Sequence, residues 1–366
     1  MNIICGFIGL GLIGGSIARA LKYKYKDNIT IIAYDIDNTA LSLSKKQGIT
    51  DVIATTIDEN FASCSYLFLC APVENNNDNL IQLKKYISSD CILTDVGSVK
   101  SGIHQQINTH GLSHQFIGGH PMAGSERTGF VNSKARLLEN AYYILTPSSS
   151  VTQEKVDAYI NLVKSMGAIP LVLSPEQHDY VTAAVSHLPH VVAASLVNLV
   201  KSSDSSEGIM KMIAAGGFKD ITRIASSSSD MWQQICTTNS ENISNLLDKY
   251  ISDLTLIKKS IDSQNSTALK NFFESARNYR DSFIDAGSGP IKKVYYLYID
   301  IADEPGALSS IANILALNGI SIKNIGITHN REAQEGALRI EFYEESSVDI
   351  AKNLLSSKGY IIYDRK

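Results

Sequence analysis

The chain is poor in the residues that mark several common classes of protein. Its 366 residues include only 5 cysteines, 8 prolines and 1 tryptophan, and no two cysteines stand in a CxxC pair. Because the number of cysteines is odd and most of them lie inside apolar runs, we expect small buried thiols rather than disulfide partners or zinc ligands. This usage is typical of a reducing compartment, so a cytoplasmic protein is expected.

The chain also lacks an excess of positive charge and long apolar runs. There are 33 Lys and Arg residues against 37 Asp and Glu residues, which gives a formal net charge of −4. This balance provides no basic surface for nucleic acid, so a small-molecule substrate is expected. No segment reaches the roughly 18 uninterrupted apolar residues of a membrane span, and no basic N-terminal region precedes a long apolar run. We therefore expect neither a membrane anchor nor a secretion signal.

What the chain does contain is three stretches of different pattern. Residues 1–173 alternate short apolar runs with helical stretches, which predicts an α/β fold with a Rossmann-type, doubly wound sheet of parallel strands. Residues 174–286 have a helical pattern throughout and predict an all-helical domain for substrate binding and dimerisation. After a Gly-Ser-Gly-Pro linker at 287–290, residues 291–366 follow the strand and helix order of a ferredoxin-like fold.

The N-terminal segment ICGFIGLGLIGGS carries a nucleotide-binding pattern. The residues expected to contact the cofactor follow an apolar strand and open a helix: Gly9, Gly11, Leu12, Ile13 and Gly14. In such a loop the glycines permit a tight turn, close approach of the backbone to a pyrophosphate, and close packing of helix on strand. Asp35 ends the next strand about 20 residues later, where its carboxylate can accept hydrogen bonds from a ribose 2′-OH. The same carboxylate would repel a 2′-phosphate, so NAD is expected rather than NADP.

Ligands of parallel sheets lie beyond the carboxyl ends of the strands, which directs attention to Ala71–Pro72–Val73, Gly97–Ser98–Val99–Lys100 and His120–Pro121. Ser98, in TDVGSVK, is expected beside the nicotinamide or bonded to its own loop. His120, in GGHP, is expected to project into the cleft. There a histidine near its ordinary pKa of about 6.5 can take the proton of an alcohol that loses a hydride. The alternative is a histidine that holds a loop by hydrogen bonds.

The helical stretch adds four polar or aromatic candidates. His187 and His190 are three residues apart in SHLPH and would share one helix face, either as pocket residues or as buried capping groups. No third ligand pattern accompanies them, so no metal is expected. Arg223 is embedded among apolar residues, where a guanidinium needs an anion such as Asp220, a helix end or a substrate carboxylate. Trp232 is expected in the core or as the wall of an aromatic-sized pocket.

Taken in order, these segments resemble the prephenate dehydrogenase family. The resemblance runs through GLGLIGGS, CAPV, TDVGSVK, GGHPMAGSERTGF, LLENAYYILTP, SHLPH and GGFKDITRIA, and the tail from DEPGALSS resembles an ACT domain. It implies a homodimer that converts prephenate and NAD to 4-hydroxyphenylpyruvate, CO2 and NADH in tyrosine biosynthesis. The ACT domain implies feedback inhibition by tyrosine, with a purely structural domain as the alternative.

The resemblance also implies roles for individual residues. His120 matches the histidine that receives the hydroxyl proton, and Ser98 matches the serine that orients this histidine and the nicotinamide. Arg223 matches the arginine that binds a substrate carboxylate. The remaining matches are expected to line the substrate pocket: Glu126, His190 and Trp232.

Other functions fit part of the same pattern. An arogenate dehydrogenase acts on a substrate with an amino group where prephenate has a keto group, and Asp35 with the whole architecture favours the NAD-dependent prephenate enzyme. A non-catalytic amino-acid sensor is disfavoured by the complete set of His120, Ser98 and Arg223. A 3-hydroxyacid dehydrogenase would rely on a lysine motif in the helical domain, and none is evident.

Overall fold

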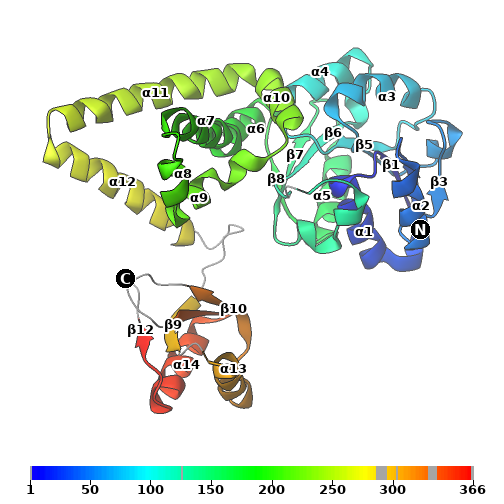
Figure 1. Cartoon of the computed structure of the whole chain (residues 1–366). Coiled ribbons are helices and arrows are strands. Elements are labelled where there is room, and N and C mark those ends of the chain that lie inside the picture. The colour runs from blue at the N-terminus through cyan, green and yellow to red at the C-terminus, as the bar shows by residue number, and fades with distance from the viewer. Residues whose placement is uncertain (1, 125–126, 286–294, 302–303, 329–335, 364–366) are drawn as a thin grey trace. The chain divides into compact units, whose positions relative to one another are not determined.

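The computed structural model of the chain describes residues 2–124, 127–285, 295–301, 304–328 and 336–363. By their contacts these residues divide into two compact units, Met1–Asn265 and Ser266–Lys366. Figure 1 shows that the first unit joins a half of sheets and covering helices to a half made of helices alone. The predicted boundary between residues 173 and 174 falls where these two halves meet, and the predicted linker at 287–290 lies outside the described residues. The three-domain division itself stays a prediction.

Five parallel strands form the main sheet, in the order β3-β2-β1-β4-β5. They are β1 (Ile3–Ile8), β2 (Ile29–Tyr34), β3 (Val52–Ile53), β4 (Tyr66–Leu69) and β5 (Ile92–Asp95). The covering helices are α1 (Leu12–Tyr25), α2 (Asn38–Lys46), α3 (Asn76–Leu83), α4 (Ser101–Thr109) and α5 (Gln153–Ser165).

Successive side chains of these strands enter two separate buried clusters, as the two-residue period of a strand requires. Phe7 and Ile31 join a cluster with residues of α1, α2 and α5. Ile8 and Ile32 join a second cluster with residues of α3 and α4. Helices therefore cover both faces, and the predicted doubly wound, Rossmann-type sheet is confirmed (Figure 1).

A second sheet has three strands, β6 (Ile117–Pro121), β7 (Tyr142–Pro147) and β8 (Ile169–Val172). β7 and β8 are parallel, but β6 and β7 are antiparallel, so the expectation that all strands of this half run parallel is wrong for this pair. Parallel neighbours need a crossover, usually a helix. Between β6 and β7 the described residues instead form two short 3-10 turns, η5 (Phe130–Asn132) and η6 (Ala135–Leu138), which pack on α1.

The helical half begins with a capping box, in which the Ser174 hydroxyl accepts from the backbone of Gln177 and Pro175 takes the first turn. Its elements are α6 (Pro175–Thr182), the π-helical turn η7 (Ala183–His187), α7 (Leu188–Ser203), α8 (Ile209–Ile213), α9 (Gly216–Thr222), the 3-10 turn η8 (Arg223–Ser226), α10 (Ser229–Thr238) and α11 (Ser240–Asp262). In η7 the N–H of Leu188 bonds to the carbonyl of Ala183, five residues back. Pro189 follows directly and has no N–H to donate, which explains a change of helical register at this point.

The helical run Pro175–Ser203 buries its polar side and exposes its apolar side. His178, Asp179, Thr182 and His187 are buried, whereas Val185 is 64% exposed. By length and composition alone the run could cross a membrane, with a mean hydropathy of 1.5, and 17% of its most apolar window is buried. An apolar pattern nearly all round the helix, as in HDYVTAAVSHLPHVVAASLVNLV, predicts burial on several sides. That prediction is wrong for this chain taken by itself. Its exposed apolar face is typical of an interaction surface.

The second unit contains α12 (Ser266–Asp285) and a four-stranded antiparallel sheet in the order β10-β11-β9-β12. The other elements are β9 (Tyr295–Ile301), α13 (Ala307–Leu317), β10 (Ile322–Thr328), β11 (Gly336–Phe342), α14 (Glu345–Ser357) and β12 (Ile362–Tyr363). Ile299, Ile311, Ile340 and Leu355 meet in one buried cluster between sheet and helices. This is the ferredoxin-like arrangement expected from the order of the elements.

Candidate active site

The strand order reverses between β1 and β4, and a crevice for ligands opens beyond the carboxyl ends of such a pair. Gly9 follows β1 with a φ of +94°, and a Cβ there would lie 2.5 Å from the backbone nitrogen of Ala71. A Cβ on Gly14 would lie 2.7 Å from the carbonyl oxygen of Gly9. At Gly11, by contrast, the space within 4 Å of an added Cβ is empty of protein atoms. Two glycines thus let the loop fold, and the third leaves room where a pyrophosphate approaches.

Asp35 lies directly after β2 and is tied to this loop. One carboxylate oxygen accepts from the backbone N–H of Leu10, and the other accepts from the N–H of Asp37 at 2.8 Å. Leu12 and Ile13 are the first residues of α1, whose first turn contains no acidic residue. Free N–H groups at a helix start and an anchored carboxylate at the end of β2 fit the diphosphate and the adenosine ribose of NAD. Ala71 and Pro72 lie on the β4 side of the crevice and lead into a 3-10 turn that begins at Val73.

His120 lies near the end of β6 and is the first member of a chain of hydrogen bonds. Its Nδ1 is 2.8 Å from Nε2 of His178, and Nδ1 of His178 is 2.8 Å from Oδ1 of Asp179. The two imidazole rings lie edge to face with centroids 5.0 Å apart. Within the described part of the chain, no residue forms a hydrogen bond with Nε2 of His120. This nitrogen is the atom that remains for a substrate.

The electrostatic surroundings of His120 favour its neutral form. Burial, followed by the neighbouring His178, Lys100 and His187, holds the pKa of His120 well below 6.5. The expectation of an ordinary histidine pKa is therefore wrong, because the side chain is surrounded by protein and by other groups that carry positive charge when protonated. A neutral imidazole is the form that can accept a proton.

A buried ion pair fixes the backbone beside His120. Lys100 Nζ donates to Oδ2 of Asp95 and also to the carbonyl oxygen of Gly119 at 2.9 Å. Asp95 accepts in turn from the N–H of Gly119 at 3.1 Å and from the N–H of Gly97 at 2.9 Å. Both charged side chains are buried, where each is tolerated only because the other is present. The end of β5, the start of α4 and the end of β6 are thus joined at one point.

Asp179 anchors the other end of the histidine chain. Its carboxylate accepts from the backbone N–H of Lys100 at 2.7 Å and of Ser101 at 2.8 Å, at the start of α4. Burial raises the pKa of Asp179, but the hydrogen bonds from His178, Ser101 and Lys100 outweigh it and hold the pKa below its usual value. Asp179 is therefore ionised at neutral pH, and α6 is joined to α4 through it.

Trp232, in α10, packs against both histidines of the SHLPH segment. The ring of His190 stacks on it with centroids 3.8 Å apart, and the ring of His187 meets it edge to face at 6.0 Å. Nδ1 of His190 bonds to the carbonyl oxygen of Ser186 at 2.9 Å. The charge of Arg223, together with the larger effect of burial, lowers the pKa of His190, so this guanidinium lies near the same group. The predicted pocket residues His190, Trp232 and Arg223 are therefore brought together.

Three predicted site residues need separate comment. Arg223 opens the turn η8 and is exposed, so the sequence argument that burial forces it to seek an anion is wrong. Its apolar neighbours are not buried either, since Ile221 is 63% exposed and Ile224 is half-buried, so local composition does not report burial here. Ser98 is half-buried in the loop between β5 and α4, one of the loops at the crevice. Glu126 lies outside the described residues.

Comparison with known families shows what this chain is similar to. The family model for the nucleotide-binding domain of prephenate dehydrogenase matches residues 17–172, and the model for the dimerization domain of prephenate dehydrogenase matches residues 174–275. Prephenate dehydrogenase of Bacillus subtilis is 38% identical over 353 residues, which cover 96% of this chain and 95% of that protein. The chain belongs to the prephenate dehydrogenase family.

Solved structures agree with this family membership. The crystal structure of prephenate dehydrogenase from A. aeolicus in complex with hydroxyphenyl propionate and NAD+ is 31% identical, has a TM-score of 0.73 and covers 77% of this chain and 99% of its own. Arogenate dehydrogenase of Synechocystis is 25% identical, has a TM-score of 0.70 and covers 77% of this chain and all of its own. The matching fold includes the doubly wound sheet and the helical half.

Several residues of the site were not among the sequence predictions: Asp95, His178, Asp179 and Asn239. Asn239 lies between α10 and α11 and donates its side-chain amide to the carbonyl oxygen of Asp179 at 2.8 Å. The adjacent acid and imidazole of the His-Asp pair at 178–179, followed by the apolar helix, were the only local signal for this part. Lys100 was visible in TDVGSVK, but a lysine after a strand gives no sign that it is buried.

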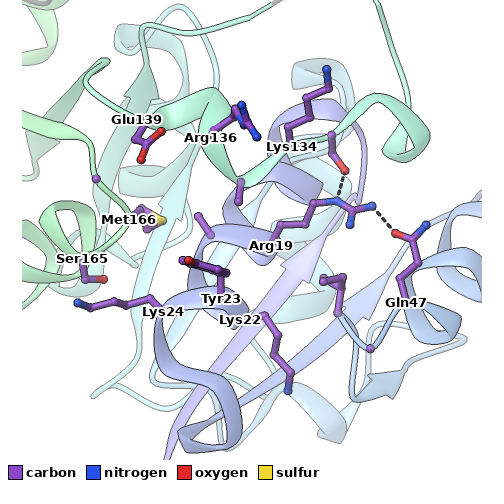
Figure 2. Close-up of a pocket in the computed structure, with 16 residues that line it drawn as sticks. Arg19, Lys22, Tyr23, Lys24, Gln47, Lys134, Arg136, Glu139, Ser165 and Met166 are labelled. Carbon is purple, nitrogen blue, oxygen red and sulfur yellow. Dashed lines mark hydrogen bonds between the residues drawn. The ribbon is translucent and has the colours of Figure 1, made fainter. Parts of the chain in front are cut away.

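A wide groove of about 1120 Å³ runs along the second half of α1 and does not include the residues of the candidate site (Figure 2). Arg19 crosses it, donating to Ser133 Oγ at 2.7 Å and to Gln47 Oε1 at 2.6 Å, with its guanidinium 4.3 Å from the centre of the Phe130 ring. Most of its charged lining is positive: Lys22, Lys24, Lys134 and Arg136. None of the predicted site residues lines this groove. Size alone therefore does not locate the reaction site.

Proposed function

We propose that this chain catalyses the NAD-dependent oxidative decarboxylation of prephenate to 4-hydroxyphenylpyruvate, CO2 and NADH, a step of tyrosine biosynthesis in the cytoplasm. The observation that carries this proposal is the neutral His120, whose Nε2 forms no hydrogen bond within the described residues. His120 lies on β6, which is tied through Gly119 to Asp95 at the end of β5, in the sheet that holds the glycine loop. The family models and the B. subtilis relative support the same reaction.

The residues of the site have distinct tasks in this reaction. Nε2 of His120 accepts the proton of the ring hydroxyl as the carbinol carbon is oxidised to a ketone. NAD, when bound, supplies the acceptor for the hydride that leaves this carbon. The ring carboxylate then leaves as CO2, its bonding electrons make the ring aromatic, and the proton held by His120 returns to the ring oxygen as the phenol forms. Because aromatisation makes the second part favourable, the protein mainly positions the substrate and moves one proton.

We assign the binding roles as follows. The Arg223 guanidinium binds a carboxylate of the substrate, and the stacked pair of His190 and Trp232 forms a flat wall for its ring. Ser98, at the loop after β5, orients His120 and the nicotinamide. Glu126 completes the pocket by resemblance to the family. Charge on Arg223 and a flat wall suit a substrate that is a small ring with carboxylate groups.

We propose a homodimer formed through the helical half. Its family model is that of the dimerization domain, and its helices expose large apolar side chains: Val185 and Leu199 in the run Pro175–Ser203, and Ile209 and Ile213 in α8. Burying such a face against a second copy removes apolar surface from water, which favours association. Size measurement by light scattering tests this assignment, with a monomer at micromolar concentration as the contrary result.

We propose tyrosine as a feedback effector bound by the second unit. A hollow of about 240 Å³ lies at the start of α13 and is lined by Asp300, Ile301, Glu304, Pro305, Gly306, Ala307, Ser310 and Tyr360. Its carboxylates and hydroxyls suit the ammonium and polar groups of a free amino acid. Removal of residues 291–366 should abolish inhibition by tyrosine while the remaining chain still turns over prephenate. Inhibition that survives this deletion would place the effector elsewhere.

The decisive experiment is a spectrophotometric assay of NADH formation at about 340 nm, with prephenate or arogenate as substrate and NAD or NADP as acceptor. Turnover of prephenate with NAD, lost on substitution His120→Asn, is the expected result. The similarity to Synechocystis arogenate dehydrogenase makes arogenate the second candidate substrate, and a higher kcat/KM for arogenate would replace our assignment. No turnover of either substrate by a folded chain that binds NAD would support a sensor instead.

A further inference from the structure

We propose that His178, held by Asp179, is a positioning residue that keeps a proton on Nδ1 of His120 and so reserves Nε2 as the atom that takes the substrate proton. The inference deepens the proposed function, since it concerns the same histidine. It rests on three hydrogen-bonded groups whose donor and acceptor roles can be worked out one after another.

The first step is the carboxylate of Asp179. It is ionised and can only accept, and it accepts from two backbone N–H groups, those of Lys100 and Ser101. Its third partner is Nδ1 of His178 at 2.8 Å. A short contact with an acceptor requires a proton between the two atoms, so Nδ1 of His178 carries one.

The second step is the imidazole of His178. This side chain is fully buried, and burial lowers its pKa even though the hydrogen bond to Asp179 acts in the opposite direction. A neutral imidazole with its proton on Nδ1 has a lone pair on Nε2. That lone pair faces Nδ1 of His120 at 2.8 Å. The bond is therefore donated by Nδ1–H of His120.

The third step gives the state of His120 itself. A neutral His120 with its proton on Nδ1 has its lone pair on Nε2, the nitrogen without a hydrogen bond in the described part of the chain. Were the proton on Nε2 instead, this atom would donate to the substrate oxygen and could not accept its proton. The order of groups Asp179, His178, His120 thus selects the one tautomer that is competent for the reaction.

The same arrangement stabilises His120 after it has taken the proton. The imidazolium keeps Nδ1–H directed at His178, and the charge of Asp179 lies at the far end of the chain of bonds. Asp179 is itself fixed by the start of α4 and by Asn239. His178 touches neither substrate nor cofactor in this scheme, so its effect is exerted through His120 alone.

Substitution of His178 tests the inference. In His178→Leu the acceptor is lost, and we expect kcat with prephenate to fall about 100-fold, within the range for proton-transfer catalysis, while KM values for prephenate and NAD change less than about threefold. In His178→Gln the amide oxygen can still accept from Nδ1–H of His120, and we expect at least about a tenfold recovery over His178→Leu. His104→Leu is the matched control, since His104 is a partly buried histidine bonded to Thr146 and not to His120. Its kcat should stay within about threefold of the parent.

The tautomer itself can be read without any turnover. In protein with 15N-labelled histidine, the His120 signals, identified by their loss in His120→Asn, should show a protonated Nδ1 and an unprotonated Nε2. The same pattern is expected in His178→Gln, whereas His178→Leu should shift the proton toward Nε2. A proton on Nε2 in the parent protein overturns the inference, as does unchanged kcat in folded His178→Leu or equal losses in the Leu and Gln variants. If the parent does not turn over prephenate, the proposed function fails, and the 15N spectra still decide the question of positioning.

Discussion

The side-chain amide of Asn239 donates a hydrogen bond to Nδ1 of His187 at 3.1 Å. The orientation of this amide is determined by its other partners, because its nitrogen also donates to the carbonyl oxygen of Asp179 and its oxygen accepts from Asn242 at 2.8 Å. Nδ1 of His187 must therefore carry a lone pair. Burial of this imidazole, with a smaller effect of His178, lowers its pKa to about 4.

Asn239→Asp should raise the pKa of His187. A carboxylate at this position can accept a hydrogen bond from a protonated Nδ1 of His187, whereas the amide nitrogen cannot. We therefore expect the pKa of His187 to rise by at least about one unit. NMR titration of the His187 ring measures it. Asn239→Leu is the control, because leucine has a similar shape but cannot accept a hydrogen bond from the imidazole. A pKa that stays near 4 in Asn239→Asp would contradict this account of the bond.

The stability of the first unit should fall in mild acid. His187 has a folded pKa of about 4 against 6.5 for the ordinary histidine, so its contribution is fully present above pH 6.5 and is lost as the pH falls toward 4. For this group alone we expect a loss of about 1–2 kcal/mol in the free energy of unfolding at pH 5, with the lower figure allowing for solvent screening. Urea unfolding followed by fluorescence of Trp232, the single tryptophan, measures it at fixed protein concentration. His187→Gln should show a flatter dependence between pH 7 and 5, and parallel curves for the two proteins would refute the assignment.

Two glycines of the nucleotide loop should respond differently to alanine. Gly9→Ala places a Cβ against backbone at a positive φ, so we expect a loss of more than about 2 kcal/mol in stability. Gly11→Ala meets no protein atom, so we expect an unchanged melting temperature and a KM for NAD raised at least about tenfold, since the methyl group fills the space of the pyrophosphate. Gly48→Ala, at a positive φ of +68° with open space around it, controls for backbone strain alone. An unchanged KM for NAD in Gly11→Ala would move the cofactor site away from this loop.

Arg223→Ala should weaken substrate binding without unfolding the protein. The side chain is exposed, so its removal creates no cavity in the core. Loss of a charge-assisted hydrogen bond to a carboxylate is expected to raise KM for prephenate about 10- to 100-fold, with a smaller effect on kcat. Steady-state kinetics measure KM, and a melting curve measures stability. Arg223→Lys keeps the charge but loses the two-pronged guanidinium, so its KM should lie between those of the parent and Arg223→Ala. An unchanged KM in Arg223→Ala would remove Arg223 from the site.

The parts of the fold that were predictable are those encoded by neighbours in the sequence. The glycine loop, the apolar strands and the individual strands and helices of the ferredoxin-like tail each depend on a short local pattern, and each is present as expected. The antiparallel pairing of β6 with β7 is different in kind. It depends on how the irregular stretch between them packs on α1, which no local period records.

Of the candidate site, the sequence predicted the residues that follow a strand or belong to a motif, but not the residues that support them. His120 could be found because it follows a strand next to two glycines. Its partner His178 lies 58 residues away in another element. Lys100 is fully buried in the structure, but nothing in its local sequence distinguishes it from a surface lysine. Arg223 shows the opposite error, since apolar neighbours in the sequence suggested burial for a side chain that is exposed. Which side of a helix faces outward is decided by tertiary and subunit packing.

The π-helical turn Ala183–His187 has a geometric consequence for the whole site. In an uninterrupted α-helix, which turns about 100° per residue, the 12 positions from His178 to His190 would leave the two side chains about 120° apart around the axis. The one extra residue taken up by the wider turn removes about 100° of that angle. A single continuous rod can therefore present the partner of the proton acceptor and the wall of the substrate pocket toward the same direction. Shortening this turn by one residue would keep the rod helical and rotate one of these groups away from the other.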